Sequence, residues 1–341
     1  MTPKTKQRIY LFVGLAISAL LIYLLFENVD FAELKAALSG ANYWWLIPNV
    51  LIIFFTMYQR AYRWKYMVAP LGEVPFRKLL AATWIGFMAN NVLPFRLGEF
   101  VRAYSLSSQH PKITKSASLA TIFTERMVFD LVALLAIFVA VLVTSDITFM
   151  SEDADGERMR MGLAIAVGIA LAGVIFVLIM ARRPEKARRL VSKYLSFLPD
   201  KWKDSIDGII SKFATGLDFL GNARAVFSIA VQTLAIWILM GLSNVFVFWA
   251  FGFDLPLEAS FMVLVAVSLS ILIPAAPGFV GVYHAAAVWA LGKYGVGLES
   301  ALSCALVLHA AQYIVVTGMG LIYMSKEHLS LKRLEEVAED A

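Results

Sequence analysis

Residues 89–102 read ANNVLPFRLGEFVR, and this stretch interrupts an apolar run in the first half of the chain. Pro94 has no backbone N–H and disfavours helical backbone at Leu93, so the preceding helix is predicted to end there. Gly98 is predicted to let the backbone turn, after which helix resumes. The sequence therefore predicts a helical hairpin with its elbow in this stretch.

The same stretch carries charges and amides that need partners if it lies in a membrane. Glu99 and Arg102 lie one helical turn apart, so they are predicted to pair. A helix that begins at the elbow has free N-terminal amides, and such an end attracts anions. The residues predicted to contact a bound group here are Asn90, Asn91, Arg96, Glu99 and Arg102. The alternative is a cytoplasmic loop whose charges are simply solvated.

The rest of the chain consists mostly of apolar runs. Of its 341 residues, 60% are hydrophobic and 16% are charged, whereas average soluble domains carry about 25% charged residues. Runs of about 18 residues or more can cross about 30 Å of hydrocarbon. Six segments are predicted to cross fully: 9–26, 44–59, 117–144, 161–181, 226–250 and 299–324. The predicted fold class is an all-α integral membrane protein, a single multi-pass domain (residues 1–341) in the cell (inner) membrane.

The charges between these segments predict their orientation, because Lys and Arg are enriched on the cytoplasmic side. Basic residues gather in three places: Lys4, Lys6 and Arg8; Arg60, Arg63, Lys65, Arg77 and Lys78; and Arg182, Arg183, Lys186, Arg188, Arg189 and Lys193. Acidic residues gather between them: Glu27, Asp30 and Glu33; Asp146, Glu152, Asp153 and Asp155; and Asp254 and Glu258. Both termini are therefore predicted to be cytoplasmic, with 325–341 as a cytoplasmic tail.

Two further apolar stretches, 76–93 and 258–292, are broken by Pro and Gly. The loop charges alternate consistently only if each stretch returns to the side from which it entered. Both are therefore predicted to be re-entrant hairpins that enter from opposite faces. Non-helical backbone at membrane depth must be buried in protein or line a cavity, which implies a cavity between the hairpins. The alternative is that each hairpin is a pair of ordinary short spans.

Each hairpin lies between two spans, so segments 44–144 and 226–324 are predicted to form an inverted repeat, as in many secondary transporters. A weak sequence echo supports this, because the spacing P-x-x-x-G occurs in both elbows, at Pro94–Gly98 and at Pro277–Gly281. The same register places Arg126 opposite His309. The alternation of loop charge is the stronger part of this argument.

The third predicted span contains three ionisable residues, Glu125, Arg126 and Asp130. A charge near the bilayer centre costs about 2.5–3.5 kcal/mol on insertion scales, so these residues should face the interior of the bundle. Arg126 and Asp130 share a helix face and are predicted to neutralise each other. Glu125 points about 100° away, and its predicted partner is Arg96 or Arg102. A purely structural ion network is an open alternative to contact with a bound group.

The second hairpin is different, because residues 273–284 read IPAAPGFVGVYH and contain no carboxylate and no arginine. The groups of this elbow that can bind a ligand are therefore its backbone amides and one imidazole. Its predicted contact residues are Pro277, Gly278, Gly281 and His284, together with His309 and Gln312 one turn apart on the last span. Packing of either histidine as a satisfied side chain is an equally good explanation.

Several classes of function are disfavoured by what the sequence lacks. Cys304 is the single cysteine, which rules out an intrachain disulfide and a cysteine-based metal cluster. There is no G-x-x-x-x-G-K-[ST], H-E-x-x-H or G-x-S-x-G motif, and no soluble stretch reaches usual domain size. We therefore predict no enzyme activity, no cofactor, no metal site and no nucleic-acid partner. Segment 184–224 is basic and amphipathic, and is predicted either to lie on an anionic leaflet or to be a solvated linker.

Three motifs together resemble the flippase-like family, also called the lysylphosphatidylglycerol synthase transmembrane-region family. They are Asn91-x-Leu93-Pro94-x-Arg96-x-Gly98-Glu99-x-x-Arg102, Glu125-Arg126-x-x-x-Asp130 and Pro274-x-x-Pro277-Gly278-x-x-Gly281. The resemblance covers residues 9–324 and implies translocation of membrane lipids by a stand-alone member without the soluble synthase domain. The family often has Gly and Glu where Phe279 and His284 stand here. An Arg is frequent where the last span has His309 or Gln312, so a cationic aminoacyl headgroup is a less safe expectation.

Three hypotheses of function follow. The first is a flippase or scramblase for a charged-headgroup phospholipid or a polyprenyl-linked lipid, with phosphate bound by Arg96 and Arg102. The second is an intramembrane transferase that modifies a lipid, with Glu99 or Glu125 as general base. The third is a non-catalytic scaffold in a lipid-glycan pathway, whose enzymes would bind segment 184–224. The expected partners are therefore anionic or polyprenyl lipids and, in the third case, such enzymes; the sequence does not predict the oligomeric state.

Overall fold

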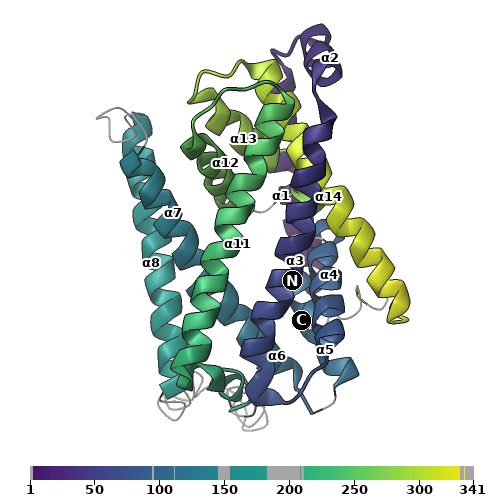
Figure 1. Cartoon of the computed structure of the whole chain (residues 1–341), viewed down its shortest axis with the longest axis vertical. Coiled ribbons are helices and arrows are strands. Elements are labelled where there is room, and N and C mark those ends of the chain that lie inside the picture. Colours follow the sequence, from purple (N-terminus) through teal and green to yellow (C-terminus); the bar gives the residue numbers. More distant parts are fainter. Residues whose placement is uncertain are drawn as a thin grey trace.

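The computed structural model describes residues 3–93, 96–110, 112–144, 154–182, 208, 211–273, 275–330 and 334, and side chains within these ranges except at 3–11, 154–160, 163 and 166. Every regular element in these ranges is a helix (Figure 1). Most of segment 184–224 and of the tail 325–341 lies outside the described residues, as do Pro94 and Pro274. The predictions made for those residues therefore stay predictions.

The chain forms a bundle of long helices with shorter ones packed between them (Figure 1). The α-helices are α1 (Pro3–Phe26), α2 (Phe31–Gly40), α3 (Leu46–Val68), α4 (Phe76–Val92), α5 (Gly98–Gln109), α6 (Lys115–Thr124), α7 (Leu131–Thr144), α8 (Ala154–Arg182), α11 (Ala223–Ala250), α12 (Leu257–Ser270), α13 (Val282–Gly292) and α14 (Leu298–Lys326). A π-helical turn, η4 (Glu125–Asp130), joins α6 to α7, and short 3-10 turns include η6 (Pro277–Phe279). In the view of Figure 1, α11 crosses between the pair α7–α8 and the group α3, α4 and α14.

Three helices of the described chain are long and apolar enough to cross a membrane: Lys115–Thr144, Ala223–Ala250 and Leu298–Lys326. A fourth span results if α1 and α2, which meet at 90°, are counted as one broken span. The remaining predicted spans at 44–59 and 161–181 coincide with helices α3 and α8. The chain is thus an all-helical membrane protein, whereas six full crossings stay a prediction.

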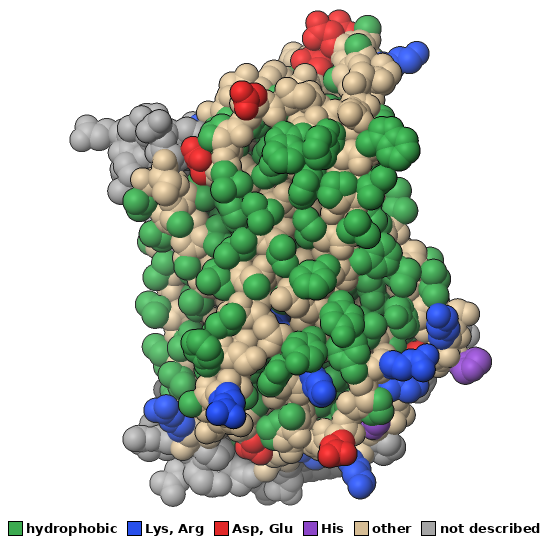
Figure 2. Space-filling model, viewed as in Figure 1, with side chains coloured by type: hydrophobic (Ala, Val, Ile, Leu, Met, Phe, Trp, Pro, Cys, Tyr) green, Lys and Arg blue, Asp and Glu red, His purple; other side chains and the backbone are tan. Residues whose placement is uncertain are grey.

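Side chains on the face shown in Figure 2 form an apolar band between two charged ends. Lys and Arg gather mainly at the end where α5 and α6 lie, and Asp and Glu dominate the opposite end (Figures 1 and 2). Exposed basic residues of the first end include Lys65, Arg77, Lys112 and Lys115, beside the acidic Glu73 and Asp218. The second end exposes Glu27, Asp30, Glu33 and Asp254, beside the basic Lys35. This distribution is the one expected of a bilayer-spanning bundle.

Helix α3 does not end where the sequence suggested. It continues past residue 59 to Val68, and Arg60 and Arg63 lie inside it with exposed fractions of 4% and 0%. The prediction that these two arginines belong to a cytoplasmic loop was wrong. The reason is electrostatic: carboxylates on a neighbouring helix pair with them, so that two guanidinium groups are buried without leaving the helix.

The first predicted hairpin consists of α4 and α5, with elbow one at Leu93–Leu97. Helix ends at Val92, and Leu93 is extended (φ −88°, ψ 146°), as the following proline predicted. Gly98 does not make the turn, because it is the first residue of α5; among the described residues of elbow one, Arg96 has a positive φ of 55°. Gly98 instead opens α5 directly against Gly86 of α4, where a Cβ atom would overlap the Gly86 carbonyl oxygen. The glycine is needed for close helix contact.

The second predicted hairpin consists of α12 and α13, with elbow two at Ile271–Gly281. Gly278 and Gly281 have φ of 74° and 92°, values that a residue with a Cβ adopts at a cost. The two elbows meet: Arg96 Nη1 donates to the Ile271 carbonyl oxygen at 3.4 Å, and its guanidinium carbon lies 5.8 Å from the centre of the Phe279 ring. Two helical hairpins of sequence-distant segments thus face each other inside the bundle.

Helix α1 covers elbow two from outside. Ser18 Oγ accepts a hydrogen bond from the backbone N–H of Ala276 at 2.9 Å. Gly14 lies so close to the Ala275 carbonyl that a Cβ would stand 2.9 Å from its oxygen. A non-helical backbone group at membrane depth needs such a partner, because no water is available there.

Candidate functional site

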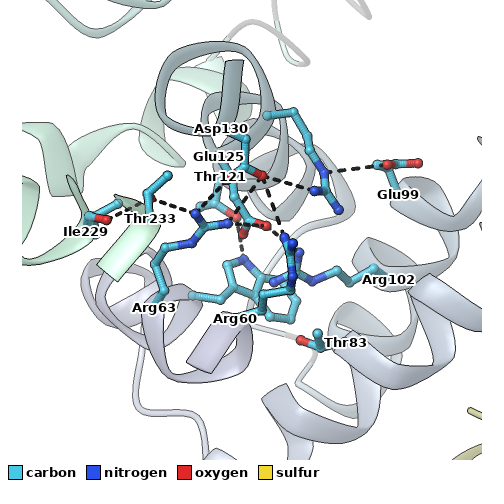
Figure 3. Close-up of polar contacts among 12 residues, drawn as sticks. Arg60, Arg63, Thr83, Glu99, Arg102, Thr121, Glu125, Asp130, Ile229 and Thr233 are labelled. Atoms are coloured by element: carbon cyan, nitrogen blue, oxygen red, sulfur yellow. Dashed lines mark hydrogen bonds and ion pairs between the residues drawn. The ribbon is translucent and has the colours of Figure 1, made fainter. Parts of the chain in front are cut away.

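The site is built around η4, the π-helical turn in the long helix Lys115–Thr144. Such turns widen a helix locally and are frequent at functional sites. Glu125 and Asp130, at the two ends of η4, are both buried. Glu125 lies ten residues, about 15 Å of helix, from Lys115, which is about half the hydrocarbon thickness. The two carboxylates therefore need partners from neighbouring helices, and Figure 3 shows them.

Glu125 has two cationic partners. Its Oε1 lies 3.0 Å from Arg102 Nη1 on α5 and 2.9 Å from Arg63 Nη2 on α3 (Figure 3). The predicted pair with Arg102 is confirmed, and the alternative pair with Arg96 does not form. Arg63 was missed by the sequence analysis. All three side chains are almost fully buried, so this is an ion network without water contact.

Asp130 completes the network on the other side of η4. It binds Arg63 Nη1 at 2.7 Å and Arg126 Nη1 at 3.0 Å, which confirms the predicted pair of Arg126 with Asp130. Trp237 Nε1 on α11 also donates to Asp130 Oδ1 at 3.3 Å, and Arg60 Nη1 lies 3.9 Å from Oδ2. A single carboxylate thus joins α3, α11 and η4.

Aromatic rings and hydroxyls hold the arginines in position. Arg102 stacks on the ring of Trp64, 4.0 Å from its centre, and Trp64 Nε1 donates to Thr121 Oγ1 at 2.9 Å. Arg63 Nη1 donates to Thr233 Oγ1 at 2.6 Å. Cations over aromatic faces are stabilised by the ring quadrupole, most strongly where water is excluded. These contacts fix the guanidinium groups in one geometry.

Glu99 lies at the edge of the network and is about one-fifth exposed. Its predicted pair with Arg102 does not form. Glu99 Oε1 accepts a hydrogen bond from Asn90 Nδ2 at 3.3 Å and lies 3.7 Å from Arg126 Nε. The reason is packing: the Arg102 side chain lies against Gly86 and reaches Glu125, away from Glu99. Asn90 Oδ1 in turn accepts the Gly98 N–H at 2.8 Å and so caps α5.

The network contains more cations than anions. Four arginines, at positions 60, 63, 102 and 126, face the carboxylates of Glu125, Asp130 and Glu99. Several buried guanidinium nitrogens have no hydrogen-bond partner among the described residues, including Arg102 Nε and Nη2 and Arg60 Nη1. Unused donors of this kind are costly at membrane depth. They are suited to an anion, for which guanidinium is the preferred planar partner.

Arg96 sits between this network and elbow two. Its guanidinium donates to the neutral Ile271 carbonyl, and it makes no salt bridge within the described chain. It is partly exposed, like Arg126. These two arginines therefore form the accessible edge of the cationic cluster, whereas Arg63 and Arg102 form its interior.

The second hairpin contributes histidines instead of charges. His284 Nε2 lies 3.2 Å from His309 Nδ1, and the Tyr283 ring stacks on His309 with centroids 4.3 Å apart. Gly278 packs against Tyr313 of α14. Gln312 is exposed on the outer face of α14 and does not join the pair.

Two more of the predicted residues lie at the meeting of the hairpins. Asn91 donates to Thr317 of α14 at 3.0 Å, and its backbone carbonyl lies near Gly278. Pro277 begins the 3-10 turn η6. The structure thus divides the predicted residues into an ionic group and a histidine group, with Arg96 between them.

No group of three or more His, Cys, Asp or Glu side chains is placed to hold a metal ion in the ranges that the structure describes. The residues that the sequence analysis missed are Arg60, Arg63, Trp64, Thr233 and Trp237. One signal could have found the arginines: the apolar face of α3 continues through Ala61, Trp64 and Met67, all buried, which indicates helix beyond residue 59.

Comparison with known proteins supports a membrane role. The chain is 26% identical, over 364 aligned positions, to a protein of Haloferax volcanii named "Glycosyltransferase AglD", and the match covers 99% of this chain and 58% of the relative. The relative is named as an enzyme, but at 26% identity its name does not decide whether this chain is one. The absence of enzyme activity therefore stays a prediction. A family model described as "Lysylphosphatidylglycerol synthase TM region" matches residues 11–320. The chain belongs to the lysylphosphatidylglycerol synthase transmembrane-region family.

Proposed function

We propose that this protein moves a lipid with an anionic headgroup, phospholipid or polyprenyl-linked, between the two leaflets of the membrane. The observation that carries the proposal is the excess of buried guanidinium groups around η4, with the partly exposed Arg96 between this cluster and elbow two. A headgroup phosphate would replace the missing anion, while the acyl or prenyl chains stay in the surrounding lipid. Membership in the family and the helical hairpins support a lipid-related role.

The edge of the cluster is where the headgroup would enter. Glu99 is partly exposed and lies 3.7 Å from Arg126 Nε, which is a loose ion pair. A phosphate that competes with Glu99 for Arg126, and also reaches Arg96, gains charge-assisted hydrogen bonds that the carboxylate does not make. The fully buried pairs of Glu125 with Arg63 and Arg102 hold the frame and need not open.

Both hairpins are part of this proposal as re-entrant elements from opposite leaflets. If α4–α5 enters from the end rich in Lys and Arg and α12–α13 from the acidic end, their elbows meet within the hydrocarbon layer (Figure 2). A headgroup could then pass from one side to the other through contact with Arg96, which belongs to elbow one and contacts elbow two. The expected location is the cell membrane, with both termini cytoplasmic.

Proteoliposomes test the proposal directly. The purified protein is reconstituted with fluorescent phosphatidylglycerol, phosphatidylcholine or a polyprenyl phosphate, and exposed probe is reduced with dithionite. We expect faster reduction of inner-leaflet anionic probe than in protein-free vesicles. Arg126→Gln should slow it about tenfold, the effect of losing one charge-assisted hydrogen bond. Glu99→Gln should speed it, because the competing carboxylate is gone.

The matched control is Arg224→Gln, an exposed arginine in the first turn of α11, about 13 Å of helix before the site residue Thr233. It should leave the rate unchanged. A rate equal to that of empty vesicles for every anionic probe would contradict the proposal, as would equal effects of the substitutions at 126 and 224.

A second candidate is transfer of a sugar to a lipid. It is favoured by the name of the Haloferax relative, which is also longer than this chain. In that case Glu99, the carboxylate nearest to solvent in the cluster, would be the general base. Mass spectrometry of lipids after incubation with sugar nucleotides would show a new glycolipid, whereas translocation leaves lipid masses unchanged.

A further inference from the structure

Elbow two is closed by two histidines on neighbouring helices, His284 at the start of α13 and His309 in α14. The Gly281 backbone N–H donates to His284 Nδ1 at 3.3 Å, and His284 Nε2 lies 3.2 Å from His309 Nδ1. His309 also packs edge-on against the Tyr313 ring, which in turn lies against Gly278. Gly278 and Gly281 are the two glycines with positive φ in this elbow. The pair therefore ties together the points where the backbone turns.

The hydrogen-bond chain has one consistent assignment of protons when both rings are neutral. His284 Nδ1 accepts from Gly281, so the proton of His284 lies on Nε2. That proton is donated to His309 Nδ1, which places the proton of His309 on its own Nε2. The three ring nitrogens between Gly281 and His309 Nδ1 are then joined in one continuous chain of hydrogen bonds.

Adding one proton breaks this chain, because both nitrogens of a protonated histidine are donors. A proton on His284 Nδ1 would face the Gly281 N–H. A proton on His309 Nδ1 would face the proton on His284 Nε2. If His284 carried its proton on Nδ1 instead of Nε2, the clash with His309 would be relieved, but that proton would then face the Gly281 N–H. Protonation of either ring therefore costs a hydrogen bond that holds elbow two.

The surroundings offer no charge that would compensate. The titratable or charged side chains near the pair are Tyr283, Tyr313 and Cys304, and Arg96 through its contact with Phe279. On the packed face of α12 the single titratable residue is Glu258, at the start of that helix and beside Tyr294. Helices α1 and α4 contribute Ser18 and Asn91, which do not titrate. No carboxylate contacts either ring within the described residues.

Opening of elbow two would remove contacts that hold Arg96 of elbow one. The Ile271 carbonyl and the Phe279 ring, at either end of the turn, are what Arg96 touches. When the turn loosens, Arg96 loses its neutral partner and becomes available to an anion. Linkage requires the reverse effect too: a conformation with elbow two open binds protons more tightly than the closed one.

We propose that His284 and His309 form a proton-binding site whose occupation opens elbow two, so that protons are the ion that gates lipid movement. This deepens the function proposed above and rests on it. In the neutral state the pair holds elbow two closed, and we call this pair the latch. Proton uptake from the side with lower pH opens elbow two. Protonation of histidine clusters changes the packing of interfaces in other proteins in this way.

The test is the pH dependence of translocation in the proteoliposome assay, with both leaflets at equal pH. The wild-type rate for anionic probe should rise about fivefold between its neutral and acid plateaus, the fold-change for loss of one hydrogen bond. His284→Asn keeps an acceptor for Gly281 but does not titrate, so its rate should not depend on pH over that range. His309→Asn should behave in the same way. The control is the double variant His110→Asn, His328→Asn, which removes the other two histidines and should keep the wild-type profile.

A second readout separates this proposal from the proposed function. In the His110→Asn, His328→Asn background, ¹⁵N-imidazole spectra report the pair alone, and a nitroxide on Val280→Cys reports the mobility of the partly exposed elbow. Titration of the pair together with a rise in nitroxide mobility on acidification supports the latch, even if no lipid probe moves. Absence of titration while the protein stays folded, or titration with an unchanged elbow, overturns it. A pH-independent wild-type rate overturns proton gating and leaves lipid translocation standing.

Discussion

The two elbows that meet in this bundle are held by opposite means. Elbow one is fixed by charge: Arg102 in the helix that follows it reaches the buried Glu125, and Arg63 binds the same carboxylate. Elbow two is held by neutral hydrogen bonds and close backbone contacts, through His284, His309 and Ser18. A buried ion pair is very costly to break, whereas a neutral hydrogen bond costs about 1 kcal/mol. The comparison teaches that elbow one is suited to be the fixed frame and elbow two the moving part.

Removing a carboxylate from the frame should have the largest effect. Glu125→Ala leaves Arg63 and Arg102 buried without their shared anion, and we expect a loss of about 3–5 kcal/mol in the free energy of unfolding. Cys304 is buried and is the single cysteine, so its reaction with a thiol-specific dye during heating reports unfolding. Glu73→Ala, at an exposed turn, is the control. A change at 125 no larger than at 73 would mean that elbow one is not held by charge.

Close helix contact in the first hairpin should give the next largest effect. Gly98→Ala places a methyl group against the Gly86 carbonyl and the Asn90 side chain, which forces α4 and α5 apart. We expect about 1–3 kcal/mol of destabilisation, typical of overpacking, in the same assay. Gly292→Ala, at the end of α13 with open space around it, should change little. Equal melting temperatures for the two variants would refute rigid packing of the first hairpin.

A neutral contact between the predicted repeats should give the smallest effect. Asn49 in α3 donates to the carbonyl and the hydroxyl of Ser243 in α11, at 3.1 and 2.7 Å. Asn49→Ala should cost about 0.6 kcal/mol, the average for a side-chain hydrogen bond between membrane helices. A loss as large as that of Glu125→Ala would remove the distinction between charged and neutral contacts on which the comparison depends.

Much of the architecture could be predicted, because hydrophobic runs and prolines act locally. The end of helix before Pro94 and the broken turn that contains Gly278 and Gly281 follow from backbone chemistry alone. The pair Arg126–Asp130 also follows, since spacing along one helix places it. Each of these is a property of a short piece of chain.

What escaped prediction depends on contacts between distant pieces. Arg60 and Arg63 resemble loop residues until Glu125 and Asp130 are placed beside them. Glu99 was paired with Arg102, one helical turn later in the sequence, which packing directs elsewhere. The close approach of Gly98 to Gly86 is likewise invisible without the second helix. No local pattern encodes a partner from another helix.

The hydroxyl of Ser18 has a consequence for biosynthesis. The backbone N–H that it satisfies belongs to Ala276, 258 residues later in the chain. A ribosome makes the acceptor first, so this hydrogen bond can form only after the chain has been made as far as residue 276. Closure of elbow two therefore joins the first helix to a segment made much later, and a truncated chain that stops before residue 276 leaves Ser18 without this partner.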